Sequence, residues 1–269
     1  MPCSQCYITW SAGEAMTTAI TALVEVRNMT LAYGDFVVQR DLNFTINRGD
    51  IFIIMGGSGC GKSTLLRHMI GLKAPVSGAL LYDGQSFLDA DPSARAALLQ
   101  RFGVMYQQGA LWSSMTLAEN IALTLEQYTT LGAGEIRELA ELKLALVGLA
   151  GFADYYPSEI SGGMQKRAGL ARAIALDPEI LFFDEPSAGL DPLSSRRLDE
   201  LILELKHSLG ATVVVVTHEL PSIFAIGTNG IFMDAARKTI VAHGSPHRIL
   251  EECDDQMVKQ FLTRGEHPL

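Results

Sequence analysis

Residues 56–64 carry glycine, lysine and hydroxyl side chains at a spacing that suits phosphate binding. Gly56 and Gly61 enclose four residues, and Lys62 and Ser63 follow. Glycines let consecutive backbone N–H groups turn toward one anion, Lys62 can reach the outer phosphates, and the Ser63 hydroxyl can ligate Mg²⁺. The residues that we expect to bind a nucleoside triphosphate are Gly56, Gly57, Ser58, Gly59, Cys60, Gly61, Lys62, Ser63 and Thr64.

The context of this loop separates it from an ordinary glycine-rich turn. An apolar run, 51–55, precedes it, and a helix is expected to begin at about Lys62. A strand before the loop and a helix after it are the arrangement that phosphate binding requires, and the helix adds the positive end of its dipole. The same loop holds Cys60, so the sequence predicts that a bulky thiol reagent would block nucleotide hydrolysis.

Two adjacent acids, Asp184 and Glu185, follow the apolar run 180–183. A carboxylate at the end of a buried strand loses hydration and needs a cationic partner, which Mg²⁺ on the triphosphate would supply to Asp184. Successive side chains of a strand point to opposite faces, so Glu185 is expected to face the γ-phosphate and polarise the attacking water. A structural ion pair is the alternative, and the phosphate loop in the same chain favours catalysis.

Gln107 and His218 also follow apolar runs, 103–106 and 213–216. Ligands of an open parallel sheet bind beyond the carboxyl ends of its strands, so both side chains are expected beside the triphosphate. His218 could contact the γ-phosphate, and Gln107 could orient water or ligate Mg²⁺. A lone histidine is usually packed or on the surface, but His218 differs because it leaves a strand of four valines at the same edge of the sheet. A glutamine after a strand is by itself a weak signal.

A second anion-binding helix start is expected at Ser161-Gly162-Gly163, ahead of the helical run 166–176. Ser161 is a good N-cap, and two glycines leave backbone N–H groups bare. One nucleotide needs one phosphate loop, so the simplest interpretation is a nucleotide shared between two copies of the chain. An ordinary capped helix remains an open alternative.

The alternation of β-rich and helical runs predicts an α/β fold with a parallel sheet covered on both faces. Between Gln107 and Pro157 the pattern becomes helical, over 116–127 and 135–149, without an evident strand. This segment is interpreted as a helical insert. Its apolar cluster is either insert core or a docking groove for a partner helix, and consists of Leu111, Trp112, Met115 and Leu117.

Composition narrows the class of protein. The 269 residues are 48% hydrophobic, and their longest apolar stretches are too short to cross a bilayer. With no secretory leader pattern, the chain is expected to be cytoplasmic. Its net charge of −9 argues against a protein that binds nucleic acid over its whole surface. Four cysteines do not suggest a disulfide framework. Cys3 and Cys6 have a spacing that metal and redox sites use, but no second Cys or His pair lies nearby, so a flexible leader is the preferred interpretation.

The expected organisation is one domain over 22–262, with the insert at about 108–157, between a flexible leader (1–21) and a tail (263–269). We hypothesise that Met16 is the natural start of the chain and that residues before it are an over-extended reading frame.

The order of these motifs resembles the nucleotide-binding subunits of ABC transporters. The series continues past the acids with Ser187-Ala188-Gly189-Leu190-Asp191, and Tyr33 matches the aromatic residue that stacks on adenine in that family. The resemblance covers about 22–262, and the combination of motifs is highly specific. It implies a P-loop NTPase (RecA-like) core with an antiparallel β subdomain and a helical insert subdomain.

The resemblance also implies a head-to-tail homodimer that closes over two ATP molecules with Mg²⁺. One copy would supply Tyr33, Lys62, Ser63, Gln107, Asp184, Glu185 and His218, and the other Ser161, Gly163 and the Asp191 loop. Closure would switch a multi-pass permease whose coupling helix lies near Gln107 and Trp112. The chain would then act peripherally, on the cytoplasmic face of the inner membrane.

Within the family, four segments resemble the Mla-type ATPases of lipid transport: 107–111, 161–168, 176–179 and 241–245. Met164 stands where sugar and amino-acid importers usually have Gln. This branch moves phospholipid or related lipids between bacterial membranes, and pairs two ATPases with two permeases, an MCE-domain protein and often a STAS-domain protein. The chain departs from some members by ending soon after Leu262, which puts contacts of a longer tail in doubt.

Two other functions remain to be weighed. The ATPase of another ABC importer or exporter, for amino acids, metals or drugs, would share the nucleotide chemistry and differ in the permease. A non-transport ABC protein acting on ribosomes or DNA fits less well, because the chain has one cassette, no heptad run and an acidic balance.

Overall fold

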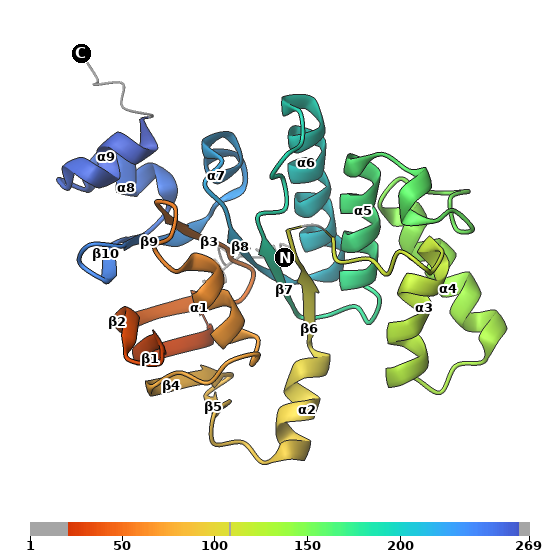
Figure 1. Cartoon of the computed structure of the whole chain (residues 1–269), viewed down its shortest axis with the longest axis horizontal. Helices are drawn as coiled ribbons and strands as arrows, with labels where there is room; N and C mark the ends of the chain where they lie inside the picture. The colour runs from red at the N-terminus through yellow and green to blue at the C-terminus, as the bar shows by residue number, and fades with distance from the viewer. Residues whose placement is uncertain (1–20, 108, 264–269) are drawn as a thin grey trace, which may run out of the picture.

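The computed structural model describes residues 21–107 and 109–263, which form two sheets and a helical insert (Figure 1). The strands are β1 (Ala22–Tyr33), β2 (Phe36–Asn47), β3 (Ile51–Gly56), β4 (Ser77–Tyr82), β5 (Gln85–Ser86), β6 (Phe102–Met105), β7 (Ile180–Asp184), β8 (Thr212–Val216), β9 (Asn229–Asp234) and β10 (Thr239–His243). The helices are α1 (Lys62–Met69), α2 (Pro92–Gln100), α3 (Leu117–Tyr128), α4 (Ala133–Leu146), α5 (Gly162–Ala173), α6 (Pro192–Leu209), α7 (Leu220–Ile226), α8 (Pro246–Glu252) and α9 (Gln256–Leu262), with a 3₁₀ turn at Pro157–Glu159.

Some sequence predictions lie outside the described residues. These are nearly all of the predicted leader and tail, the Cys3–Cys6 spacing and the Met16 start, as well as Gln108 in the segment that resembles the lipid-transport branch.

The larger sheet has the order β10-β9-β3-β8-β7-β6, and all neighbours pair in parallel except β10 with β9. All four apolar runs singled out in the sequence lie in strands of this sheet, except that Tyr106 follows the end of β6. Every residue of β3, β7 and β8 is buried, because both faces of the sheet are covered. Burial on both faces explains why these strands are continuous apolar runs rather than alternating ones.

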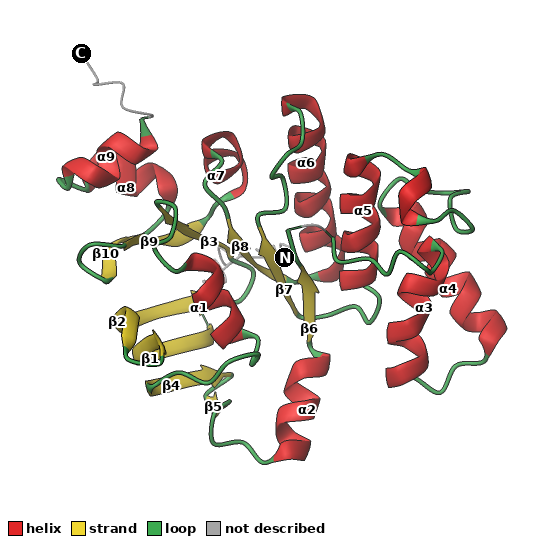
Figure 2. Cartoon of the chain, viewed as in Figure 1, coloured by secondary structure: helices red, strands yellow, loops and turns green. Residues whose placement is uncertain are grey.

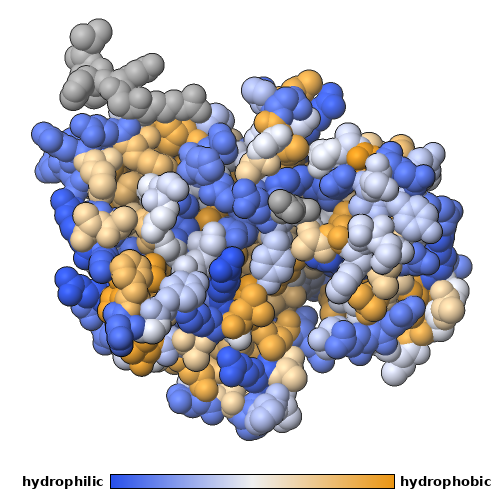
Figure 3. Space-filling model, in the orientation of Figure 1, coloured by the Kyte–Doolittle hydropathy of each residue, from blue (hydrophilic) through white to orange (hydrophobic). Residues whose placement is uncertain are grey.

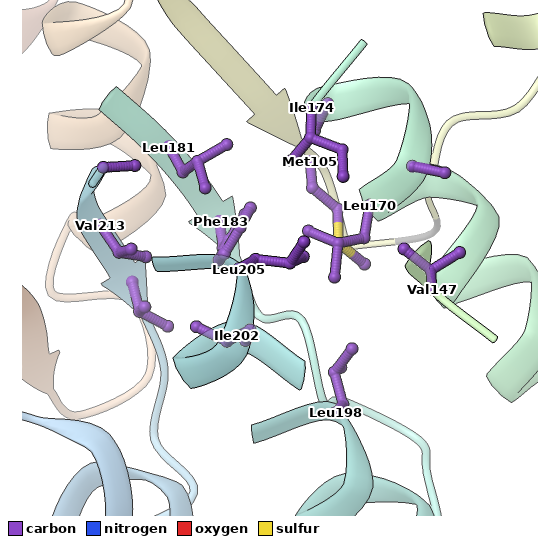
Figure 4. Packing of buried hydrophobic residues seen from close by; sticks show 14 of the residues in the cluster. Met105, Val147, Leu170, Ile174, Leu181, Phe183, Leu198, Ile202, Leu205 and Val213 are labelled. Carbon is purple, nitrogen blue, oxygen red and sulfur yellow. The ribbon is translucent and has the colours of Figure 1, made fainter. Parts of the chain in front are cut away.

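Alternate residues of each strand enter two different cores. On β3, Ile53 packs into the cluster that includes α5, α6 and α7, and Ile54 into the cluster that includes α1 and the smaller sheet. In Figure 4, Phe183 of β7 and Val213 of β8 lie near Leu205 of α6. The two cores fix the direction of every strand that ends at the candidate site.

The smaller sheet is antiparallel, with the order β2-β1-β4-β5. It lies on the α1 side of the larger sheet, as Figure 2 shows. Strand β1 runs as far as Tyr33 because β2 pairs with it across the Gly34 turn despite several register shifts. This length is what carries Tyr33 to the site.

Gln39 on β2 ties this sheet to the larger one. Its side chain is fully buried, and its Nε2 donates to the backbone oxygens of Cys60 (2.6 Å) and Asp234 (3.0 Å). A buried amide bonded to two main-chain groups is a strong positional constraint, because an unmet buried group costs about 1–3 kcal/mol. The phosphate loop is therefore anchored from both sheets.

The insert is helical, as predicted, with shifted boundaries. The first helix begins at Leu117 because Thr116 and Glu119 form a capping box. The second begins at Ala133, two residues earlier than predicted, since the Glu135 carboxylate accepts a hydrogen bond from the N–H of Gly132. It ends at Leu146 rather than 149, ahead of a left-handed glycine at position 148.

The predicted apolar cluster of the insert divides into core and surface. Leu117 is fully buried, whereas the Trp112 side chain is 58% exposed. On the face drawn in Figure 3, apolar and polar residues are interspersed. Across 21–107 and 109–263, no helix combines the length and apolar character that crossing a bilayer demands.

Candidate nucleotide-binding site

A pocket of about 820 Å³ opens at the carboxyl end of the larger sheet. It is lined by Tyr33, Phe36, Val38, Gly56, Gly57, Ser58, Gly59, Gly61, Lys62, Ser63, Thr64, Gln107, Glu185, His218 and Phe261. Residues from four separate strand ends therefore meet at one place, as the sequence predicted for an open parallel sheet.

The phosphate loop depends on glycine at two positions. Gly56 has φ +144°, and a Cβ there would lie 2.4 Å from the carbonyl oxygen of Met233. Gly61 has φ +100°, and a Cβ there would lie 2.7 Å from Val38. Only glycine fits both the backbone conformation and the space, so the path of the loop is fixed by these residues.

Lys62 is the first residue of α1, and its side chain folds along the loop. Its ammonium donates to the carbonyl oxygens of Gly56 (2.9 Å) and Gly57 (3.0 Å). The side chain is largely buried and lines the pocket, so its charge is held at the mouth of the loop. The start of α1 directs its backbone N–H groups to the same point, a geometry that suits an anion.

Asp184 is the last residue of β7 and accepts a hydrogen bond from the Ser63 hydroxyl (2.8 Å, Oδ1). Its side chain is buried, while that of Gln107 is exposed at the pocket. A hydroxyl, a carboxylate and an amide supply the oxygen ligands that Mg²⁺ prefers. The predicted metal ligands Ser63 and Asp184 are thus in direct contact.

The side chain of Glu185 is oriented by a turn that follows the strand. This corrects the expectation from sequence, which assigned its orientation to the alternation of side chains along a strand. The strand ends at Asp184, Glu185 has φ +50°, and its N–H donates to the carbonyl of Val216 (2.8 Å). A non-glycine residue in this region stores strain, which surrounding contacts must hold.

The carboxylate of Glu185 has one oxygen fixed and one without a partner. His218 Nδ1 donates to Oε1 (2.8 Å), and Oε2 is buried without a hydrogen bond in the described part of the chain. Buried polar atoms nearly always have partners, so Oε2 is the atom whose hydrogen bond is left for a substrate or water. The contact between His218 and Glu185 was not predicted from the sequence, although both residues were.

Three aromatic side chains line the pocket and are called here the aromatic wall: Tyr33, Phe36 and Phe261. Tyr33 is 46% exposed, and the Lys73 ammonium lies 3.2 Å from its ring centroid and donates to the carbonyl of Ala32 (2.6 Å). This cation–π contact covers one face of the ring. Phe36 and Phe261 complete the wall. Sequence reasoning missed both, although Phe36 stands three residues after Tyr33 in the same hairpin.

The second predicted anion site lies outside this pocket. Ser161 caps α5 by accepting from the N–H of Met164 (3.3 Å), and Asp191 caps α6 by accepting from the N–H groups of Leu193 and Ser194 (3.1 Å each). Ser161 and Gly163 line a separate hollow, and Gly162 another. Within one chain, these residues do not meet the phosphate loop.

The expectation that a thiol reagent would reach Cys60 is wrong. Its side chain is 1% exposed, and burial raises the pKa of the thiol. Its Sγ lies 2.7 Å from where a Cβ of Gly56 would stand, so it points beneath the loop. A buried thiol with a raised pKa is inert.

We therefore expect slow modification of Cys60 when the other three cysteines are replaced by serine. The thiolate, which is the reactive form, is scarcer at any given pH when the pKa is raised, so modification should be at least ~10-fold slower than in the unfolded chain. Release of thionitrobenzoate at pH 8, with and without denaturant, measures both rates. Equal rates would show that Cys60 is accessible.

Comparison with known proteins agrees with this geometry. A family model described as ABC transporter matches residues 39–188, more than half of the chain. The chain belongs to the ABC transporter family. Two solved cassettes share its fold. One is cbiO1 from Clostridium perfringens, part of the transporter complex cbiONQ, at 26% identity and a TM-score of 0.78 over 86% of this chain and 92% of that one.

The other is a dimeric bacterial ABC transporter cassette, MJ0796, at 29% identity and a TM-score of 0.75 over 83% of this chain and 98% of that one. The same cassette has been solved as a dimer in a post-hydrolysis state bound to ADP and Pi. The core, antiparallel sheet and helical insert expected from the motifs are therefore those of an ABC ATPase.

Two curated relatives are closer in sequence. The intermembrane phospholipid transport system ATP-binding protein MlaF of Escherichia coli K12 is 40% identical over 92% of this chain and 91% of its own length. The probable ribonucleotide transport ATP-binding protein mkl of Mycobacterium tuberculosis H37Rv is 39% identical over 89% of this chain. The chain spans 66% of the length of that mycobacterial relative.

Proposed function

We propose that this ABC cassette hydrolyses ATP between two copies of itself and thereby powers a permease that moves phospholipid or a related lipid between bacterial membranes. The observation that carries the hydrolysis is the convergence of the phosphate loop with Glu185 and His218 in one pocket. Three kinds of group meet there: an anion cradle, a carboxylate with an available oxygen, and an imidazole that orients it.

In this proposal the phosphate loop and Lys62 hold the phosphates, and Tyr33 stacks on adenine with the face not covered by Lys73. The Oε2 atom of Glu185 accepts a proton from water as the new O–P bond forms and the bond from the γ-phosphorus to the bridging oxygen breaks. His218 holds the other oxygen, which keeps Oε2 directed at the water.

Mg²⁺ would be held by Ser63, Asp184 and Gln107, whose oxygen atoms suit a hard cation. When bound, it neutralises charge on the phosphates of ATP. The contact of Ser63 Oγ with Asp184 Oδ1 keeps these two donors together.

The second copy would complete the site with its Ser161, Gly163 and Asp191. Two findings support this. These residues stand at the first turns of α5 and α6, outside the pocket of their own chain. In addition, MJ0796, which shares the fold, has been solved as a dimer. A helix start with bare N–H groups is suited to the γ-phosphate of the opposite nucleotide.

The proposal that the transported substrate is a lipid rests on the comparison with MlaF. That alignment covers more than nine tenths of both chains, whereas the one with mkl leaves a third of the relative unmatched. Met164 and the segments that resemble Mla-type ATPases point to the same branch. Its partners would be a multi-pass permease, an MCE-domain protein and a STAS-domain protein, and its place the cytoplasmic face of the inner membrane.

A pull-down of the tagged chain from detergent-solubilised native membranes tests this proposal, with untagged cells as the control. We expect a multi-pass permease, an MCE-domain protein and phospholipid. A permease with a solute-binding protein, or one that retains nucleotides instead of lipid, would support the ATPase function and rule out lipid transport. Ribosomal or DNA-associated partners would rule out a function in membrane transport.

A further inference from the structure

One face of α5 is bonded to the backbone of the loop that follows β6. Lys166 donates to the carbonyl of Gln107, and Arg172 donates to those of Gly109 (3.1 Å) and Ala110 (2.6 Å). Between them Gly169 allows close contact, since a Cβ there would lie 2.8 Å from the Cα of Gly109. The loop that carries Gln107 is thus attached to α5 at Gln107, Gly109 and Ala110.

Lys166 makes a second contact that Arg172 does not. Its ammonium also donates to the carbonyl oxygen of Glu185 (3.3 Å). A single cation therefore joins the main chain of two residues of the nucleotide pocket, 78 positions apart in the sequence. It comes from the helix whose first turn is capped by Ser161.

This ammonium is buried at a cost. The Lys166 residue is 7% exposed, and burial lowers its pKa, an effect that the Glu185 charge opposes. In the described part of the chain, the Lys166 ammonium forms no ion pair, so its hydrogen bonds to carbonyl oxygens must offset the loss of hydration. Of the described residues, those two carbonyls are its hydrogen-bond partners. Glu185 needs such support, because its backbone has φ +50°.

We propose that Lys166 is a positioning residue for ATP hydrolysis: its ammonium fixes the main chains of Gln107 and Glu185 relative to each other and to α5. Lys166 does not contact the reacting atoms. It sets where Glu185 Oε2 and the Gln107 amide stand when α5 is seated. This inference rests on the proposed function, in which Glu185 is the base.

The test compares three variants of the full chain assembled with its native membrane partners. Lys166→Met keeps the length and apolar stem of the side chain and removes the donor. Lys166→Arg restores a cation that can donate to both carbonyls. Lys143→Met is the matched control, because Lys143 is also buried (3% exposed) but pairs with Asp177, away from the pocket.

We expect kcat of Lys166→Met to fall about 10- to 100-fold, since a misplacement of about 1 Å is enough for such a loss. The Kd for a fluorescent ATP analogue should change less than about threefold, because the substitution removes no proposed contact to the phosphates or to adenine. Lys166→Arg should recover most of kcat, and Lys143→Met should keep it.

An unchanged kcat in folded Lys166→Met overturns the inference. So does a parallel loss of affinity and kcat that Lys143→Met shares, because that pattern reports general destabilisation. If Lys166→Met fails to fold, Lys166→Leu takes its place, since it also has no donor for either carbonyl, and it must show the same loss. Wild-type complex that hydrolyses no ATP would count against the proposed function instead.

Discussion

Replacing Glu185 by Gln should leave ATP binding intact and slow hydrolysis about 10²- to 10⁴-fold, the range expected on removal of a general base. The amide oxygen of Gln can still accept from His218, so the side chain keeps its place, but it cannot take a proton from water. Binding should survive because the loop and Lys62, which we propose hold the phosphates, are unchanged.

Phosphate release and equilibrium binding of ATP measure the two effects, and light scattering reports whether ATP holds two Glu185→Gln chains together. Glu179→Gln is the matched control: it lies just before β7, at the opposite end of the strand, where its carboxylate pairs with Arg101. The control should turn over normally. Near-normal turnover in Glu185→Gln would remove Glu185 as the main catalytic carboxylate.

Replacing Lys62 by Ala should weaken ATP binding itself, by about 10- to 100-fold in Kd. Hydrogen bonds to charged groups contribute about 1.5–3 kcal/mol each, and the change removes the ammonium that reaches the outer phosphates. Part of the loss would come from the loop, because Lys62 also bonds the carbonyls of Gly56 and Gly57.

Isothermal titration of the folded variant with ATP measures this loss. Lys259→Ala, which removes an exposed ammonium from α9, provides the comparison and should bind as the wild type does. Affinity in Lys62→Ala equal to that of the wild type would be incompatible with a phosphate-binding role for residues 56–64.

The parts of the site that the sequence predicted are those encoded locally. A run such as 180–183 is apolar because both faces of the sheet are covered, and the change to Asp184-Glu185 marks where the strand ends. Parallel strands bring such ends together, so the convergence with His218 follows from the pattern. The phosphate loop is recognisable from its own residues, because the glycines, Lys62 and Ser63 are consecutive or nearly so in the chain.

The parts that sequence could not predict depend on distant contacts. Gln39 reaches Cys60 and Lys166 reaches Glu185 across the fold, and no pattern in the sequence indicates either contact. Phe261 enters the pocket from the last described helix, over 200 positions after Tyr33. The direction of the Cys60 thiol was misjudged because the loop sequence does not show which side chain points beneath it.

The interpretation of the insert changed for a similar reason. Leu117 and Trp112 look alike in a list of apolar residues, yet the first is core and the second surface. Leu117 is the first residue of α3, directly after the capping box at Thr116, whereas Trp112 lies in the loop ahead of that helix. The role of Trp112 as a contact for the permease stays a prediction.

The measurement that tests the central claim most directly is ATP-driven transfer of labelled phospholipid by the native complex in proteoliposomes. The account predicts transfer that needs ATP and is lost when the chain carries Glu185→Gln. A wild-type complex that hydrolyses ATP and moves no lipid would contradict it, as would equal ATP-dependent transfer by the two complexes.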